Sequence, residues 1–260
     1  DIFMTETAEL ADIVLPASSF AEKRGCVTNT ERRVQRMNEA LAPLEGTRPD
    51  WRIVCELATR MGYPMKYASP DDILDEIADL TPIYGGIRPS RIDGGGLQWP
   101  CPDEDHPGTP YLHKGEFVRG RGKFHPVEYR PPHEPVDEEY PLVLTTGRSL
   151  YHYDTVMTRK SPGLDELCPE ATLEINPVDA AALNLTDEAY AKVSSRRGEI
   201  LAKAEVTETT PVGTVYTTFH FHEAAANLLT TAAYDPVTKT SEYKVCAVRV
   251  EAASRAAEPV

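Results

Sequence analysis

The stretch Leu144-Thr145-Thr146-Gly147-Arg148-Ser149-Leu150-Tyr151-His152-Tyr153-Asp154-Thr155 decides how this sequence is interpreted. Residues 141–145 form a short apolar run that is typical of a buried strand. The run ends in Thr146-Gly147-Arg148, which puts a hydroxyl, a permissive backbone and a guanidinium at one strand end. An arginine binds phosphate in a bidentate manner and stacks on rings, so this pattern suits a flat heterocycle that carries phosphate. The alternative from local chemistry alone is an ordinary polar surface loop.

The continuation of this stretch makes the interpretation more specific. The sequence TTGRSLYHYDT-V-MTRKSPGL, residues 145–164, resembles the cofactor loop of the molybdopterin oxidoreductases of the dimethyl sulfoxide reductase family, most of all the formate dehydrogenase large subunits. Two departures affect the detailed contacts of the loop: Asp154 stands where a His is common, and the segment before Met157 is one residue short. The resemblance implies that the cofactor is bound by Thr146, Gly147, Arg148, Ser149, Leu150, Tyr151, His152, Tyr153, Asp154 and Thr155.

Composition limits the classes of partner. The chain has 260 residues, 41% apolar and 26% charged, which is ordinary for a globular protein with ample core. Its formal charge of −14 argues against nucleic acid or an anionic membrane surface as the partner. No apolar run approaches the length of a membrane span, and the start does not resemble a signal peptide. The first residues, Asp1 to Thr5, resemble the middle of a strand rather than the start of a chain.

The cysteines and histidines give no metal motif. The five cysteines are scattered without a CxxC pair, which predicts reduced thiols in a cytoplasmic compartment and neither a zinc nor an iron–sulfur site. His220 and His222 could form a metal pair on one strand face, but no carboxylate or cysteine lies at ligand spacing. We therefore expect no metal ligand and no catalytic residue in this chain.

The first 80 residues indicate part of an α/β domain. Residues 10–16 predict a buried strand of a parallel sheet. Asp50 is expected to cap a helix that buries Ile53, Val54, Leu57, Ala58 and Met61 and stops at Gly62. Ser69 and Pro70 are expected to open a second helix that buries Ile73, Leu74, Ile77 and Leu80. One strand and two helices are too few for a doubly wound sheet, which indicates a remnant of such a domain.

The block ETAELADIVLPASSFAEKRGCVTNTERRVQR, residues 6–36, is also similar to the molybdopterin oxidoreductases. Asn29 falls where the family places an Asn side chain near the dinucleotide. Arg32 and Arg33 follow closely. The alternative to a role near the dinucleotide is that these two arginines form an ordinary solvated charge cluster.

The remainder predicts a linker and a β-domain. From Thr81 to Asp137 prolines and glycines recur without periodicity, as in a long linker. Beyond it we expect a capped helix at 176–183, a hairpin of 190–195 with 199–207, and strands at 214–222 and 245–250. These short strands indicate a closed β-barrel. The predicted divisions are 1–80 for the α/β remnant, 81–137 for the linker, 138–252 for the barrel and 253–260 for a tail.

The resemblance identifies this barrel as the double-psi β-barrel that binds the molybdopterin dinucleotide. It also adds three cofactor-binding positions, Phe219, Asn227 and Lys244, which match an aromatic position, an Asn-x-Leu-Thr motif and a Glu-Tyr-Lys-x-Cys-Ala-Val motif. A carboxamide can meet both donors and acceptors on a pterin edge, and a lysine offers a point charge to phosphate. A packed Phe, a turn-forming Asn and an exposed Lys are the structural alternatives.

The family implies a function for the whole enzyme. Formate would be oxidised to CO₂ at molybdenum or tungsten held by two pterin guanine dinucleotides, the bis-molybdopterin guanine dinucleotide cofactor. Electrons would leave through a 4Fe-4S cluster, expected upstream, to a partner of flavin or ferredoxin type. This chain would supply part of the cofactor site and be inactive alone. A nitrate reductase of the same family and a non-catalytic pterin-binding module are the alternatives.

Overall fold

The structure is a computed structural model that describes residues 1–152 and 157–254. The chain forms two compact units, residues 1–125 and residues 126–260, which are described separately. In the described part of the chain, no helix combines the length and the apolar character needed to cross a membrane.

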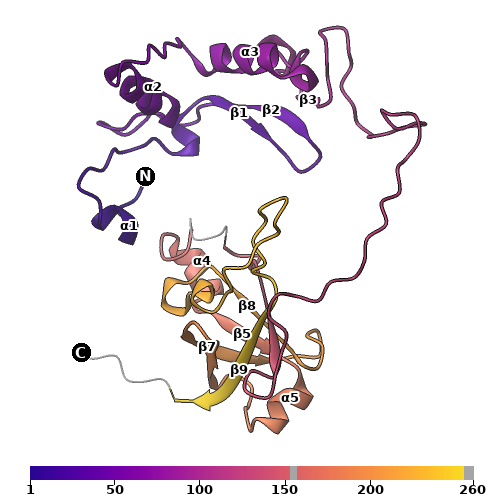
Figure 1. Ribbon diagram of the computed structural model, residues 1–260. Helices are drawn as coiled ribbons and strands as arrows, with labels where there is room; N and C mark the ends of the chain where they lie inside the picture. The colour runs from indigo at the N-terminus through magenta and orange to yellow at the C-terminus, as the bar shows by residue number, and fades with distance from the viewer. Residues whose placement is uncertain (153–156, 255–260) are drawn as a thin grey trace. The chain divides into compact units, whose positions relative to one another are not determined.

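The first unit combines helices with a small antiparallel sheet (Figure 1). Strands β1 (Gly25–Thr28) and β2 (Arg33–Met37) form a hairpin, and β3 (Leu97–Gln98) pairs with β2. The helices are α1 (Glu6–Glu9), α2 (Asp50–Arg60) and α3 (Pro70–Leu80), with 3₁₀ turns at Phe20–Glu22, Pro82–Tyr84 and Pro89–Arg91. The core of this unit is Val34, Leu74, Ile87, Ile92 and Cys101. Three of these five residues come from the stretch that was predicted as linker, so the start of that stretch packs into the first unit.

The predicted strand at residues 10–16 is wrong. None of these residues is in a strand, and Leu10 and Ile13 are 89% and 80% exposed. An apolar run becomes a strand only when a neighbour pairs with its backbone groups. Within the described residues no strand of the small sheet pairs with this run.

The two predicted helices form, but their buried faces are narrower than expected. Ser69 caps α3 through a capping box with Asp72, and Pro70 is its first residue, as predicted. Pro49, not Asp50, is the cap of α2, because Asp50 is already helical. Cys55 is the buried residue of α2 and Leu74 and Ala78 are those of α3. Much of the predicted apolar face is exposed, namely Val54, Leu57, Met61, Ile77 and Leu80.

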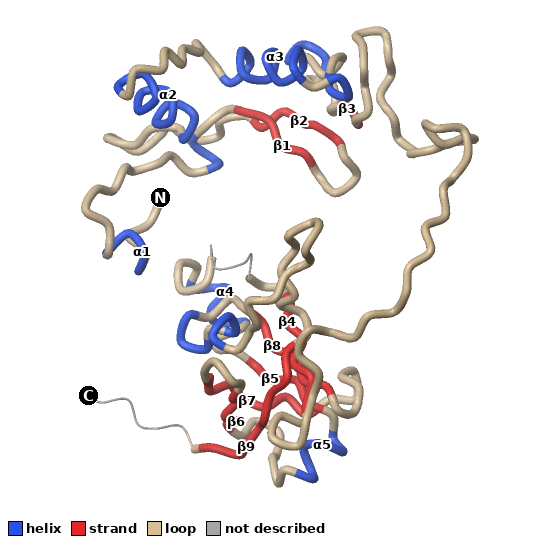
Figure 2. The backbone as a smooth tube through the Cα atoms, in the orientation of Figure 1, coloured by secondary structure: helices blue, strands red, loops and turns tan. Residues whose placement is uncertain are grey.

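The second unit contains a closed barrel of six strands in the order β4-β8-β5-β7-β6-β9 (Figure 2). The strands are β4 (Leu142–Gly147), β5 (Thr172–Ile175), β6 (Tyr190–Ser194), β7 (Glu199–Val206), β8 (Thr214–Thr218) and β9 (Cys246–Ala253). The pairs β4–β8 and β5–β7 are parallel, and the other four neighbours are antiparallel. This closed, mixed barrel confirms the predicted fold class.

Alternation along the strands fills the barrel interior. The burial pattern of β7 alternates, with Ile200, Ala202 and Ala204 inside, as expected when side chains point to opposite faces in turn. Leu144, Leu173, Ile175, Val193, Val215 and Val248 complete the centre of the core. The predicted hairpin is β6–β7, and the predicted helix is α5 (Pro177–Ala182), capped by the Asn176 side chain. Helix α4 (Pro162–Leu167) and 3₁₀ turns at His222–Ala224 and Ala226–Leu228 (η5) lie in the connections.

Candidate functional site

Two parallel strands, β4 and β8, end side by side and define the candidate site. Gly147 is paired with Thr218 in the register of these strands. The Tyr216 hydroxyl donates to the Arg148 carbonyl at 3.0 Å, which fixes the chain where it leaves β4. A Cβ atom on Gly147 would lie 2.4 Å from that hydroxyl, so a side chain here would displace the Tyr216 ring. A glycine is therefore needed at 147 for a close approach and not for an unusual backbone angle.

Lys244 reaches this strand end from the segment before β9. Its Nζ donates to the Thr146 carbonyl at 2.5 Å, and the Thr146 hydroxyl donates to the Tyr243 carbonyl at 3.2 Å. The ammonium also lies 5.7 Å from the centre of the Phe219 ring and 5.2 Å from that of Tyr243, within the range of cation–π attraction. The structure thus brings together Thr146, Phe219 and Lys244, three of the predicted residues.

The loop after β4 is anchored by two buried histidines. The Ser149 amide donates to His220 Nε2 at 2.6 Å, so this nitrogen carries no proton. The Nε2 atom of His152 lies 3.0 Å from the Cys168 carbonyl, and the two imidazole centres are 5.8 Å apart. The Phe221 ring meets His152 edge-on at 5.1 Å. His152 and His220 are 3% and 1% exposed, so the contacts that anchor the loop are shielded from solvent.

A cavity of about 520 Å³ opens beside this loop. Its lining includes Arg148, Ser149, Tyr151, Tyr216 and Thr218. The lining also includes Lys203 and the carboxylates of Glu170, Glu174, Glu188 and Glu205, and Lys203 forms ion pairs with Glu170 and Glu188. Burial, followed by the nearby Glu174 charge, raises the pKa of the Tyr216 hydroxyl. These carboxylates repel phosphate, so an anionic group is more favourable next to the Arg148 guanidinium or the Lys244 ammonium than next to them.

Two buried polar atoms at this end suit a ligand with polar edges. His152 Nδ1 and Thr218 Oγ1 are buried and have no hydrogen-bond partner within the described residues. Leaving such atoms unpaired costs about 1–3 kcal/mol each, a cost that a ligand donor or acceptor removes. The histidine, the hydroxyl and the two cations therefore fit a flat, polar-edged heterocycle that carries phosphate.

Comparison with known proteins agrees with this chemistry. Residues 142–247 match the molydopterin dinucleotide binding domain, and residues 1–60 match the molybdopterin oxidoreductase model. Over 96% of its length the chain is 50% identical to the F420-dependent formate dehydrogenase 2 subunit alpha of Methanococcus maripaludis, of which it covers 38%. The chain belongs to the molybdopterin oxidoreductases.

Other members of the molybdopterin oxidoreductases show similar coverage. Formate dehydrogenase H of Escherichia coli is 41% identical over 99% of this chain, which covers 37% of that protein. The assimilatory nitrate reductase catalytic subunit of Bacillus subtilis is 39% identical over 96% of the chain, which again covers 37% of it. The chain thus spans well under half the length of these relatives. Acetylene hydratase from Pelobacter acetylenicus shares the fold with a TM-score of 0.70 at 16% identity, over 96% of this chain and 39% of that one.

Three predicted residues of the second unit, Leu150, Tyr151 and Asn227, are exposed rather than joined to the cluster. Leu150 and Tyr151 are 93% and 44% exposed, although they lie on the same loop. Asn227 is exposed in η5. Asn29 belongs to the first unit, where its side chain accepts from the Glu31 and Arg33 amides in the β1–β2 turn. Tyr153, Asp154 and Thr155 lie outside the described residues.

The structure also separates the two histidines that were weighed as a metal pair. His220 is buried beyond the end of β8, whereas the His222 side chain is 66% exposed. Within residues 1–152 and 157–254 no group of three or more His, Cys, Asp and Glu side chains could hold a metal ion. The role of His220 as the acceptor for the Ser149 amide was missed. The sequence signal for this role was that His220 stands between two apolar rings, Phe219 and Phe221.

Proposed function

We propose that this chain supplies part of the dinucleotide site of a formate dehydrogenase catalytic subunit whose cofactor is bis-molybdopterin guanine dinucleotide. The observation that carries the proposal is the cluster at the ends of β4 and β8, where Lys244, Thr146 and Phe219 meet beside two unpaired buried polar atoms. The identity of 50% to a protein named as a formate dehydrogenase alpha subunit supports formate as the substrate.

Different side chains would contact different parts of the cofactor. Arg148 and Lys244 would hold anionic phosphate, since hydrogen bonds between ionised groups are the strongest of their kind. His152 Nδ1 and Thr218 Oγ1 would meet polar atoms of the heterocycle, and Asn29 of the first unit would contact the dinucleotide. The other proposed contacts with the cofactor are Asn227 and the loop residues Gly147, Ser149, Leu150, Tyr151, Tyr153, Asp154 and Thr155. The cofactor, with molybdenum or tungsten, supplies the redox chemistry.

For the rest of the enzyme, we extend the proposal to what the family resemblance implies. Electrons would pass through a 4Fe-4S cluster to a subunit of flavin or ferredoxin type, in a cytoplasmic enzyme. We keep 1–80, 81–137, 138–252 and 253–260 as the proposed divisions of the chain. The 260 residues alone are expected to be inactive.

Formate-dependent dye reduction by the natural protein tests this function. We expect purified protein to reduce a viologen dye with formate and to release an oxidised, fluorescent pterin on denaturation. Nitrate with reduced dye is the matched control, because a nitrate reductase is also 39% identical to this chain. Nitrate reduction without formate oxidation would replace the proposed substrate, and pterin without either activity would favour a non-catalytic module.

A further inference from the structure

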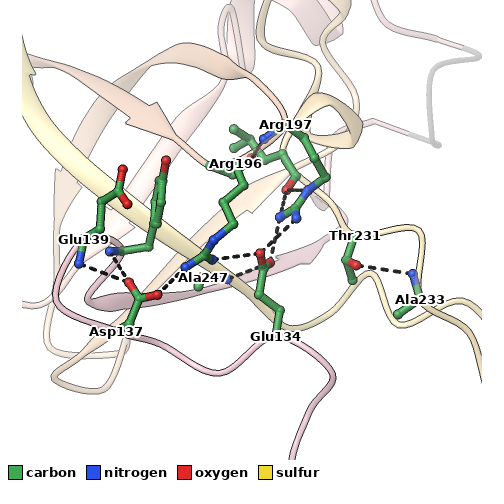
Figure 3. Close-up of polar contacts among 11 residues, drawn as sticks. Glu134, Asp137, Glu139, Arg196, Arg197, Thr231, Ala233 and Ala247 are labelled. Carbon is green, nitrogen blue, oxygen red and sulfur yellow. Dashed lines mark hydrogen bonds and ion pairs between the residues drawn. The ribbon is translucent and has the colours of Figure 1, made fainter.

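A short segment before the barrel, residues 133–137, makes contacts that the sequence did not suggest. We call these residues the strap. Figure 3 shows Glu134 of the strap between the two arginines of the β6–β7 turn. Its Oε1 accepts from Arg196 and from Arg197 at 2.9 Å each, and its Oε2 accepts from Arg197 at 2.7 Å. The fork of two parallel bonds to Arg197 is the strong geometry for this pair.

Arg197, which is bonded to Glu134, also contacts the segment that carries Asn227. Its Nε and Nη2 atoms donate to the Leu229 carbonyl at 3.0 and 2.7 Å. The Leu229 side chain is fully buried, and Asn227 lies two residues before it. A Cβ atom on Gly198 would lie 3.1 Å from the Leu228 carbonyl, so the turn and this segment are closely packed. Arg197 is therefore bonded to the backbone two residues after Asn227.

The strap also contacts the segment that carries Lys244, on both sides of that residue. The Ala247 amide of β9 donates to Glu134 Oε2 at 3.2 Å (Figure 3). The His133 amide donates to Glu242 Oε1 at 3.0 Å. Lys244 lies between Glu242 and Ala247, so its segment is fixed before and after it.

The Glu134 carboxylate is suited to hydrogen bonds that persist at neutral pH. Its side chain is 10% exposed, and hydrogen bonds from Arg197, followed by those from Arg196 and the Ala247 amide, lower its pKa to about 2 despite its burial. A lowered pKa means that the folded state favours the ionised form. The carboxylate is therefore charged at neutral pH and keeps its four bonds.

We propose that Glu134 is a positioning residue, which through Arg197 and Ala247 holds the two segments that carry Asn227 and Lys244 in place for the dinucleotide. This rests on the proposed function. Neither Glu134 nor Arg197 touches the cluster at the ends of β4 and β8. Their contribution is to fix the segments in advance, which lowers the ordering cost of binding.

The test compares Glu134→Ala with Asp137→Ala in the 260-residue chain by hydrogen exchange and mass spectrometry. Asp137 is a matched control because it lies on the same strap and pairs with Arg196, but is not bonded to Arg197 or Ala247. We expect Glu134→Ala to speed exchange about tenfold in residues 226–231 and 242–247, with β5 unchanged. The control should change both segments by less than about twofold.

A second measurement, the pterin content per folded natural protein, connects the strap to the site. Glu134→Ala should lower it about tenfold, Asp137→Ala should leave it unchanged, and Arg197→Lys should fall between because lysine cannot form the fork. Faster exchange spread evenly over all strands, unchanged exchange, or full pterin content in Glu134→Ala would overturn the proposal. An absence of pterin from the unsubstituted protein would instead refute the proposed function, and the exchange data alone would then decide what the strap holds.

Discussion

Replacing both Arg148 and Lys244 with alanine is expected to remove most of the pterin from the natural protein. The two cations lie at the same strand end, where Lys244 already contacts the Thr146 carbonyl and the Phe219 ring. A well-formed hydrogen bond between charged groups contributes roughly 1.5–3 kcal/mol. Each single substitution should therefore weaken cofactor retention by about 10- to 100-fold, at 1.4 kcal/mol per decade.

The double variant separates a shared site from two independent ones. If both cations hold one dinucleotide, their combined effect should depart from the sum of the single effects, whereas independent surface residues simply add. The matched control is Lys192→Ala with Arg249→Ala, which removes the same charge from the paired strands β6 and β9. Circular dichroism checks that each variant is folded. Full pterin content in the Arg148→Ala, Lys244→Ala variant would show that this strand end is not the site.

Replacing Leu173 with alanine is expected to cause a large loss of barrel stability. Leu173 is fully buried in β5, between its register partners Ala204 of β7 and Thr217 of β8. A buried Leu→Ala change costs about 2–5 kcal/mol, because it loses apolar burial and leaves a cavity. The chain has two units, so a single unfolding transition is not assumed. The measurement is therefore the free energy of opening of β5 and β7, from native-state hydrogen exchange.

Val178→Ala provides the control for this substitution. Val178 lies in α5 and is 62% exposed, so its replacement should change the same free energy by less than about 0.5 kcal/mol. A loss below about 1 kcal/mol for Leu173→Ala would mean that the barrel core is not packed as the structure has it.

The barrel was predictable because its signals are local. The β6–β7 hairpin follows from alternation on either side of Arg196-Arg197-Gly198, and α5 follows from Asn176 and Pro177. The wrong strand at residues 10–16 had the same kind of local signal. What it lacks among the described residues is a pairing partner, and composition does not reveal a partner.

The contacts of the site were less predictable because they join distant residues. Lys244 and Thr146 are 98 positions apart, and Glu134 and Arg197 are 63 apart. The family resemblance pointed to Thr146, Phe219 and Lys244, which do meet. It gave no reason to connect the turn at 196–198 with a segment that was predicted as linker. That connection exists only once the barrel has closed.

The most direct test of the central claim is a hydrogen-exchange footprint of the cofactor on the natural protein. Exchange is compared between the protein as isolated and the same protein prepared without pterin. We predict slower exchange with cofactor in the peptides that contain residues 146–152 and 242–246, with the β6–β7 hairpin unchanged. Unchanged exchange in both peptides, together with protection elsewhere in the protein, would contradict the assignment of the dinucleotide to the ends of β4 and β8.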